Sequence, residues 1–196
     1  MGEHGLRCAA MEVSSHAIDY HRVDGVKYAV AGFTNLTQDH LDLHGTMEHY
    51  FESKAQLFTP ERAELAVITA DDSWGEKMHA SAAERMGAEH VHRLVTARGA
   101  GLAEVPAEFG ERDWAVVRVQ REGLGHRFYL ENGAGESIEC YTGLPADFNV
   151  SNAALAALMA YLDTDAAERE LLLPALASGP ALTPVVPGRM QLISLA

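Results

Sequence analysis

Apolar and polar positions along the first half of the chain follow two different periods. Four short apolar runs predict strands buried on both faces, at residues 8–13, 28–34, 65–69 and 91–95. Apolar residues at helical spacing predict helices over residues 47–58 and from Asp72 to about Met86, with Thr46 and Asp72 as N-caps. Strands that alternate with helices predict an α/β fold, with a mostly parallel sheet flanked by helices.

In the second half of the chain, apolar and polar residues first alternate one by one. Residues 114–142 alternate between apolar and polar, with turns at Gly123 and at Asn132-Gly133. This pattern predicts β-hairpins in a small antiparallel sheet appended to the α/β body. Stretches rich in alanine and leucine then predict helices over residues 152–162 and 166–176, and the proline-containing tail at 178–188 is expected to be largely extended.

Composition narrows the class of protein. The chain has 196 residues, is 47% hydrophobic and carries a formal net charge of −13, with its acidic residues spread along its length. One globular domain with a real core is expected, and the charge disfavours a broad nucleic-acid or anionic-membrane surface. No apolar run approaches the ~20 residues of a membrane-spanning helix, so we expect no membrane insertion. Cys8 and Cys140 fit no metal-binding spacing and indicate free thiols in a reducing cytoplasm.

Polar residues follow the predicted strands where ligands of parallel sheets bind. Glu12 and Ser14 end the first run, and Asn35 follows the second. Because the carboxyl ends of parallel strands lie at one edge of a sheet, we expect these residues near one another, together with the loop that runs to His44.

That loop carries a dense group of possible metal ligands, namely Asp39, His40, Asp42 and His44. Two histidines and two aspartates at this spacing can ligate a divalent metal, as a dinuclear metallo-hydrolase would require. The alternative is a polar loop that satisfies its own backbone and caps the following helix. The loop alone does not choose between these interpretations.

Two charged residues in apolar surroundings are further candidates. Glu12 follows apolar residues 9–11, so either the position is exposed or a cation such as Mg²⁺ offsets the cost of burying the carboxylate. Lys54 lies near Phe51, Leu57 and Phe58, where burial would favour the neutral amine. A neutral amine can add carbon dioxide and become an anionic carbamate, whereas an ordinary helical lysine extends to solvent.

Three residues in the second half are candidates for nucleotide contacts. Asn149 and Asn152 lie at the start of a predicted helix, where either one caps the helix or reads a flat heterocycle through its amide. Arg189 follows a rigid Pro-Gly turn and is either a bidentate phosphate ligand or an ordinary surface arginine.

Taken in order along the chain, these segments resemble the Mur ligases. The resemblance rests on residues 11–58, 67–72, 148–158 and 186–191. The first block is the most specific, since Ser-Ser-His, Thr-Asn-Leu-Thr and Asp-His-Leu-Asp occur in it at the family's spacing. Similarity covers nearly the whole chain and is weakest across residues 99–144. It implies the P-loop-like central domain of this family, and within the family the chain is most similar to members that add the third residue of the cell-wall peptide.

The resemblance implies roles for particular residues. The implied magnesium ligands and catalytic residues are Glu12, His40 and Lys54, the lysine being carbamylated. The implied contacts to the adenine nucleotide are Asn149, Asn152 and Arg189. The implied contacts to the muramoyl-peptide substrate are Ser14 and Arg22. The sequence departs from the family pattern at Thr69, Asp147 and Gln191. None of these departures removes a predicted metal ligand, but they weaken the expectation for contacts at the periphery of the nucleotide site.

The activity implied is ATP-dependent amide-bond formation through an acyl phosphate. A third amino acid, such as diaminopimelate or lysine, would be joined to UDP-N-acetylmuramoyl-L-Ala-D-Glu during peptidoglycan synthesis in the bacterial cytoplasm. The cofactors implied are ATP and Mg²⁺.

The resemblance also implies that the chain is a fragment. The family's Gly-Thr-Asn-Gly-Lys-Thr phosphate loop is not found here. We therefore expect residues 1–185 to be a central domain without its P-loop portion, and residues 186–196 to begin the link to a C-terminal domain. Such a fragment is predicted to be inactive alone, with an exposed sheet edge that favours self-association.

Three alternatives remain at this point. A fragment of a folylpolyglutamate or cyanophycin synthetase would share the architecture and the modified lysine. A metallo-hydrolase using the loop at residues 39–44 would act with Mn²⁺ or Zn²⁺ and no nucleotide. A non-catalytic interaction module would bind neither nucleotide nor metal and would retain only self-association.

Overall fold

A single six-stranded sheet organises the chain, with its strands in the order β1-β2-β3-β4-β5-β6. The computed structural model describes residues 8–37, 45–96 and 109–184. The strands are β1 (Tyr28–Phe33), β2 (Ala63–Thr69), β3 (Val91–Val95), β4 (Asp113–Glu122), β5 (Gly125–Asn132) and β6 (Ser137–Thr142). The strands predicted at residues 28–34, 65–69 and 91–95, the strands predicted within residues 114–142, and the predicted fold class are confirmed.

The sheet is parallel from β1 to β4 and antiparallel from β4 to β6. Leu94 on β3 lies opposite Trp114 on β4, so the hairpins continue the parallel sheet. The predicted antiparallel hairpins are therefore present, and they are appended to the α/β body as a continuation of its own sheet. Alternation in the sequence identifies strands and turns, but it carries no information on which earlier strand β4 pairs with.

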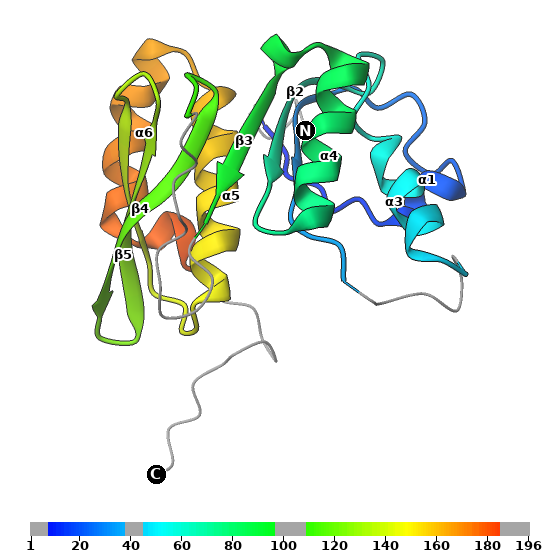
Figure 1. The fold of residues 1–196 in the computed structure, drawn as a ribbon. Helices are drawn as coiled ribbons and strands as arrows, with labels where there is room; N and C mark the ends of the chain where they lie inside the picture. Colours follow the sequence, from blue (N-terminus) through cyan, green and yellow to red (C-terminus); the bar gives the residue numbers. More distant parts are fainter. Residues whose placement is uncertain (1–7, 38–44, 97–108, 185–196) are drawn as a thin grey trace.

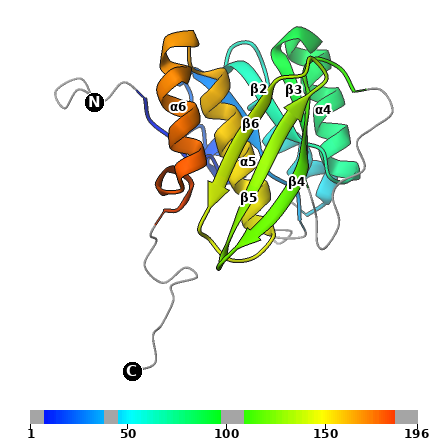
Figure 2. The same ribbon diagram turned by 90° about the vertical axis from the view of Figure 1, so that its left-hand side faces the viewer.

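Helices cover both faces of the sheet (Figure 1). Helices α1 (Ser15–Asp19), α3 (Met47–Ala55) and α4 (Ser73–Met86) lie on one face. Helices α5 (Phe148–Leu162) and α6 (Ala166–Ser178) lie on the other, side by side in Figure 2. Short 3₁₀ turns occur at Ala88–His90 and Pro180–Leu182. The second of these interrupts the tail that the sequence predicted to be largely extended.

Two apolar clusters separate the layers. On β2, Ala66 and Ile68 face the α1, α3 and α4 layer, whereas Val67 between them faces α5. All three side chains are fully buried, as expected for a strand covered on both sides.

Helix caps agree with the sequence. Thr46 Oγ1 accepts a hydrogen bond from His49 N at 3.1 Å, and Asp72 Oδ1 accepts one from Gly75 N at 2.8 Å. Asp165 and Glu168 form a reciprocal capping box at the start of α6. Helix α5 begins at Phe148, earlier than predicted, because its first turn follows directly from the tight bend at Ala146.

The predicted strand at residues 8–13 is not formed. Residues 8–14 have no regular secondary structure, and Ala9 and Glu12 among them are exposed. A strand needs a hydrogen-bonded neighbour as well as an apolar run, and among the described residues β1 pairs only with β2. The segment instead lies along the free edge of β1, where it lines a hollow.

Candidate functional site

A hollow of about 660 Å³ runs along the free edge of β1. One wall is the segment from Ala9 to His16, and the other consists of β1 with Thr34. Side chains from both helical layers also reach it, including Lys54 near the end of α3 and Met159 on α5. The hollow therefore extends from one face of the sheet to the other around its edge strand.

Glu12 and Lys54 both line this hollow. Burial lowers the pKa of the Lys54 amine, and the carboxylate of Glu12 opposes that shift. The lysine Nζ also lies 5.2 Å from the centre of the Tyr50 ring. Glu12 itself is exposed, so its charge needs no cation to offset burial. The structure thus brings two of the three predicted metal ligands to one hollow, while His40 lies outside the described residues.

The residue before Lys54, Ser53, forms hydrogen bonds that connect α3 to α1. The Ser53 side chain is buried and donates to Asp19 Oδ1 at 2.5 Å. Ser53 Oγ also lies 3.4 Å from the carbonyl oxygen of Ser15. These contacts fix α3 against α1, and α1 directly follows the wall that carries Glu12. Ser53 and Asp19 were not among the residues predicted from the sequence, although a serine inside an otherwise apolar helix face is a signal for such a contact.

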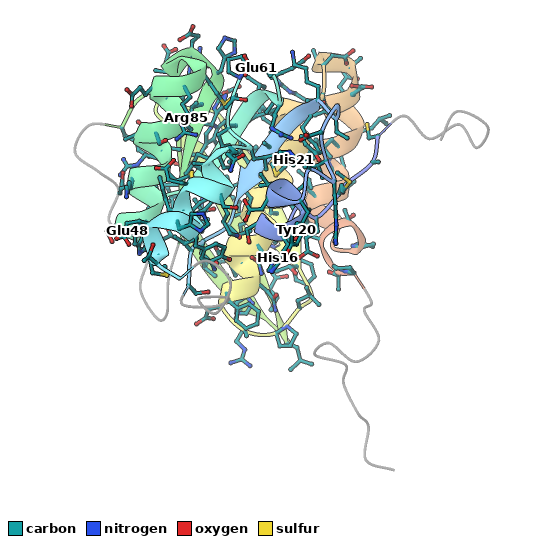
Figure 3. All side chains as sticks on the ribbon, turned by 90° about the vertical axis from the view of Figure 1, so that its right-hand side faces the viewer. His16, Tyr20, His21, Glu48, Glu61 and Arg85 are labelled. Carbon is teal, nitrogen blue, oxygen red and sulfur yellow. The ribbon has the colours of Figure 1, made fainter. Side chains whose placement is uncertain are left out.

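The two predicted substrate contacts flank α1, with Ser14 just before the helix and Arg22 in the turn that follows it. Ser14 lines the hollow and is the N-cap of α1, accepting a hydrogen bond from Ala17 N at 3.2 Å. Arg22 is exposed, with its guanidinium carbon 5.4 Å from the centre of the Tyr20 ring. Figure 3 shows Tyr20 at the surface beside His16 and His21.

The two predicted adenine contacts have different surroundings on α5. Asn149 is 8% exposed, and its Nδ2 donates to the carbonyl oxygen of Pro145. Asn152 is exposed one turn later on the same helix. Of this pair, only Asn152 presents its amide to solvent, whereas Asn149 holds the bend that precedes the helix.

A buried polar network joins the carboxyl ends of β2 and β3 to α5. Thr96, which is 1% exposed, donates from its N and its Oγ1 to the two carboxylate oxygens of Asp71, each at 2.6 Å. The hydroxyls of Thr96 and Ser151 are 2.9 Å apart. The sequence pattern did not indicate this network, because Thr96 and Ser151 lie far from Asp71 along the chain.

Several predicted residues cannot be placed. His40, with the loop at residues 39–44, and Arg189, with Gln191, lie outside the described residues. Within the described ranges, no group of three or more His, Cys, Asp or Glu side chains is arranged to hold a metal ion.

Comparison with known proteins identifies the family. The family model described as the Mur ligase middle domain matches residues 1–160. The UDP-N-acetylmuramyl-tripeptide synthetase of Leifsonia xyli subsp. xyli is 36% identical over 195 residues, which cover 99% of this chain and 34% of that protein. The UDP-N-acetylmuramoyl-L-alanyl-D-glutamate–2,6-diaminopimelate ligase of Streptomyces coelicolor is 37% identical over 194 residues. These residues cover 97% of this chain and 34% of that protein.

Solved structures agree with this result. A structure of a UDP-N-acetylmuramoyl-L-alanyl-D-glutamate–2,6-diaminopimelate ligase superposes with a TM-score of 0.74 at 27% identity, covering 99% of this chain and 36% of the other. A complex of FPGS with AMPPCP and folate shares the fold with a TM-score of 0.62 at 21% identity. The match covers 87% of this chain and 37% of the FPGS chain. The chain belongs to the Mur ligase family, and it spans about a third of the length of the relatives it matches.

The buried position of Lys54 predicts a pH-dependent effect on stability. Because the folded-state pKa lies below the ordinary value of 10.5, the charged amine destabilises the fold at every pH below that folded-state pKa. This penalty disappears as the pH rises from the folded-state pKa towards 10.5. Lys54→Met should therefore raise the free energy of unfolding at pH 7 by roughly 1 kcal/mol, with a smaller gain at pH 10.

Urea unfolding in CO₂-free buffer at the two pH values measures this difference. Lys27→Met is the matched control, because Lys27 is an exposed lysine in a surface ion pair with Glu64. An equal gain at both pH values, or a loss of stability at pH 7, would contradict the assignment of a destabilising buried charge.

Proposed function

We propose that this chain is the ATP-handling middle domain of a ligase that forms the third amide bond of the peptidoglycan precursor. The observation that carries the proposal is the convergence of Glu12, Ser14 and Lys54 on one hollow in a chain of this family. Proteins that match nearly the whole chain are named as tripeptide synthetases or diaminopimelate ligases. The folylpolyglutamate alternative has weaker support, because the FPGS structures share the fold at about 20% identity.

In the proposed reaction, the terminal carboxylate of UDP-N-acetylmuramoyl-L-Ala-D-Glu attacks the γ-phosphorus of ATP. This step forms an acyl phosphate and releases ADP. The amine of the incoming diamino acid then attacks the acyl carbon, and the tetrahedral intermediate expels phosphate as the nitrogen loses a proton. Ser14 and Arg22, which flank α1, would hold the muramoyl peptide, and Asn152 would contact the adenine.

Magnesium would neutralise phosphate charge during this chemistry. We assign its protein ligands to Glu12, His40 and a carbamate on Lys54, and a phosphate contact to Arg189. The lowered pKa of Lys54 supports the carbamate, because the neutral amine is the form that attacks carbon dioxide. In that addition a C–N bond forms and the nitrogen releases one proton, which leaves an anionic carboxylate at the end of the side chain.

The extent of the domain and its setting also belong to the proposal. We assign residues 1–185 to the middle domain, without its phosphate-loop portion, and residues 186–196 to the beginning of a link. The described helices contain none that is long and apolar enough to cross a membrane. With substrates made inside the bacterial cell, the proposed location is the cytoplasm.

Magnesium-dependent nucleotide binding tests the main proposal. The chain should bind ATP more tightly with Mg²⁺ than with EDTA, and Asn152→Ala should weaken binding about tenfold in both conditions through loss of the amide contact. Glu12→Gln should remove most of the gain in ATP affinity that Mg²⁺ gives, and it should leave the dissociation constant measured in EDTA unchanged. Isothermal titration calorimetry measures the dissociation constants, with Glu64→Gln as a surface-charge control. A chain that binds no ATP, or equal magnesium effects in wild type and Glu12→Gln, would refute these assignments.

The carbamate has a separate spectroscopic test. Chain equilibrated with ¹³C-bicarbonate should show one carbamate carbon resonance that is absent from Lys54→Met and present in Lys27→Met. The signal should grow from pH 6 to pH 8, since deprotonation of the amine precedes addition. A signal that persists in Lys54→Met would assign it to another amine and remove the carbamate from the proposal.

We further propose that the edge of β1, which pairs only with β2 in the described part of the chain, permits self-association of the isolated chain, since an edge strand offers backbone groups to a second copy. Light scattering over a concentration series should show dimers that Ala29→Lys abolishes, because Ala29 is exposed on β1 and a charge there opposes edge pairing. Ala181→Lys, at another exposed alanine, should leave the dimers intact. A monomer at every concentration would contradict the proposal.

A further inference from the structure

One aromatic side chain is exposed where an aromatic ring is normally buried. Phe148, the first residue of α5, is 58% exposed, whereas Phe33, Phe51, Phe58 and Phe128 are all buried. Its helix begins at the carboxyl edge of the parallel strands, beside Thr96 at the end of β3. This is the edge at which sheets of this class bind ligands.

Phe148 has an exposed amide as its neighbour on the helix surface. Asn152 follows it by four residues, and side chains at this spacing lie about 5–6 Å apart between Cβ atoms. Both side chains are exposed, so an aromatic ring and an amide one turn apart share one face at the beginning of α5. A ring offers a stacking surface, and an amide offers both a donor and an acceptor to the edge of a heterocycle.

The beginning of α5, which carries this pair, is held at several points. Asn149 donates to the carbonyl oxygen of Pro145, and the hydroxyl of Ser151 lies 2.9 Å from that of Thr96. Asp147 Oδ1 lies 3.5 Å from Nε2 of the buried His126. Such contacts reduce the ordering that a ligand would otherwise require.

The bend before the helix has an unusual backbone conformation. Ala146 has a φ of +74°, in the left-handed region that a residue with a Cβ adopts only at a cost. Strain of this kind is retained where the surrounding structure demands it, often at ligand sites. Ala146 lies between Pro145, whose carbonyl oxygen accepts from Asn149, and the exposed Phe148.

We propose that Phe148 stacks on the adenine ring of the bound nucleotide and, with Asn152, determines specificity for the base. The inference rests on the proposed nucleotide-binding function and adds to it the residue that supplies the stacking surface. Base stacking on an aromatic side chain typically contributes about 1–3 kcal/mol.

Calorimetry with two ligands tests the inference, using ATP and inorganic tripolyphosphate, which has no base. Phe148→Leu should weaken ATP binding about tenfold, which corresponds to 1.4 kcal/mol, and leave tripolyphosphate binding unchanged. Phe148→Tyr retains the ring and should bind ATP as the wild type does. Leu171→Ala is the matched control, since Leu171 is an apolar side chain 80% exposed on α6.

The outcomes separate this inference from the proposed function. If the wild type binds ATP and Phe148→Leu binds it equally well, the stacking assignment is wrong and the nucleotide function stands. If the wild type binds no ATP, both fail together. Should Phe148→Leu not fold, Phe148→Trp replaces it: ATP but not tripolyphosphate should quench the added fluorescence, and equal quenching by both ligands would overturn the inference.

Discussion

Parallel pairing of β1 through β4 places the carboxyl ends of these strands along one edge of the sheet, and the candidate chemistry depends on that edge. Asp71 follows β2 and Thr96 follows β3, which lets one carboxylate accept two hydrogen bonds from a residue far away in sequence. Helix α5 begins at the same edge, where Ser151 in its first turn contacts Thr96. Without parallel pairing, these groups would lie at opposite ends of the sheet.

The hollow beside β1 depends on a second constraint, the attachment of α3 to α1. Ser53 and Asp19 join the two helices through a short hydrogen bond, so Lys54 remains over the hollow and partly removed from water. Loss of solvation favours the neutral amine, while Glu12 across the hollow favours the charged one. The balance between burial and this carboxylate sets how readily the amine reacts or binds a proton.

The beginning of α5 places two identical side chains in different surroundings. Asn149 and Asn152 carry the same amide, yet Asn149 is directed inward to Pro145 and Asn152 outward to solvent. The left-handed bend at Ala146 and the contact of Asp147 with His126 determine where that first turn lies. The start of α5 therefore leaves one ring, that of Phe148, and one amide, that of Asn152, exposed to solvent.

The amino-acid sequence by itself determined the strand at Tyr28–Phe33, the caps at Thr46 and Asp72 and the turns of the hairpins, because these features depend on neighbouring residues. It also indicated that Glu12 and Lys54 were unusual, from their apolar surroundings. Only the tertiary structure decided that residues 8–13 are not a strand, that β4 pairs with β3, and that Asn149 is buried while Asn152 is not. Pairing and burial depend on which distant segments meet, and no local pattern of hydrophobic and polar residues contains that information.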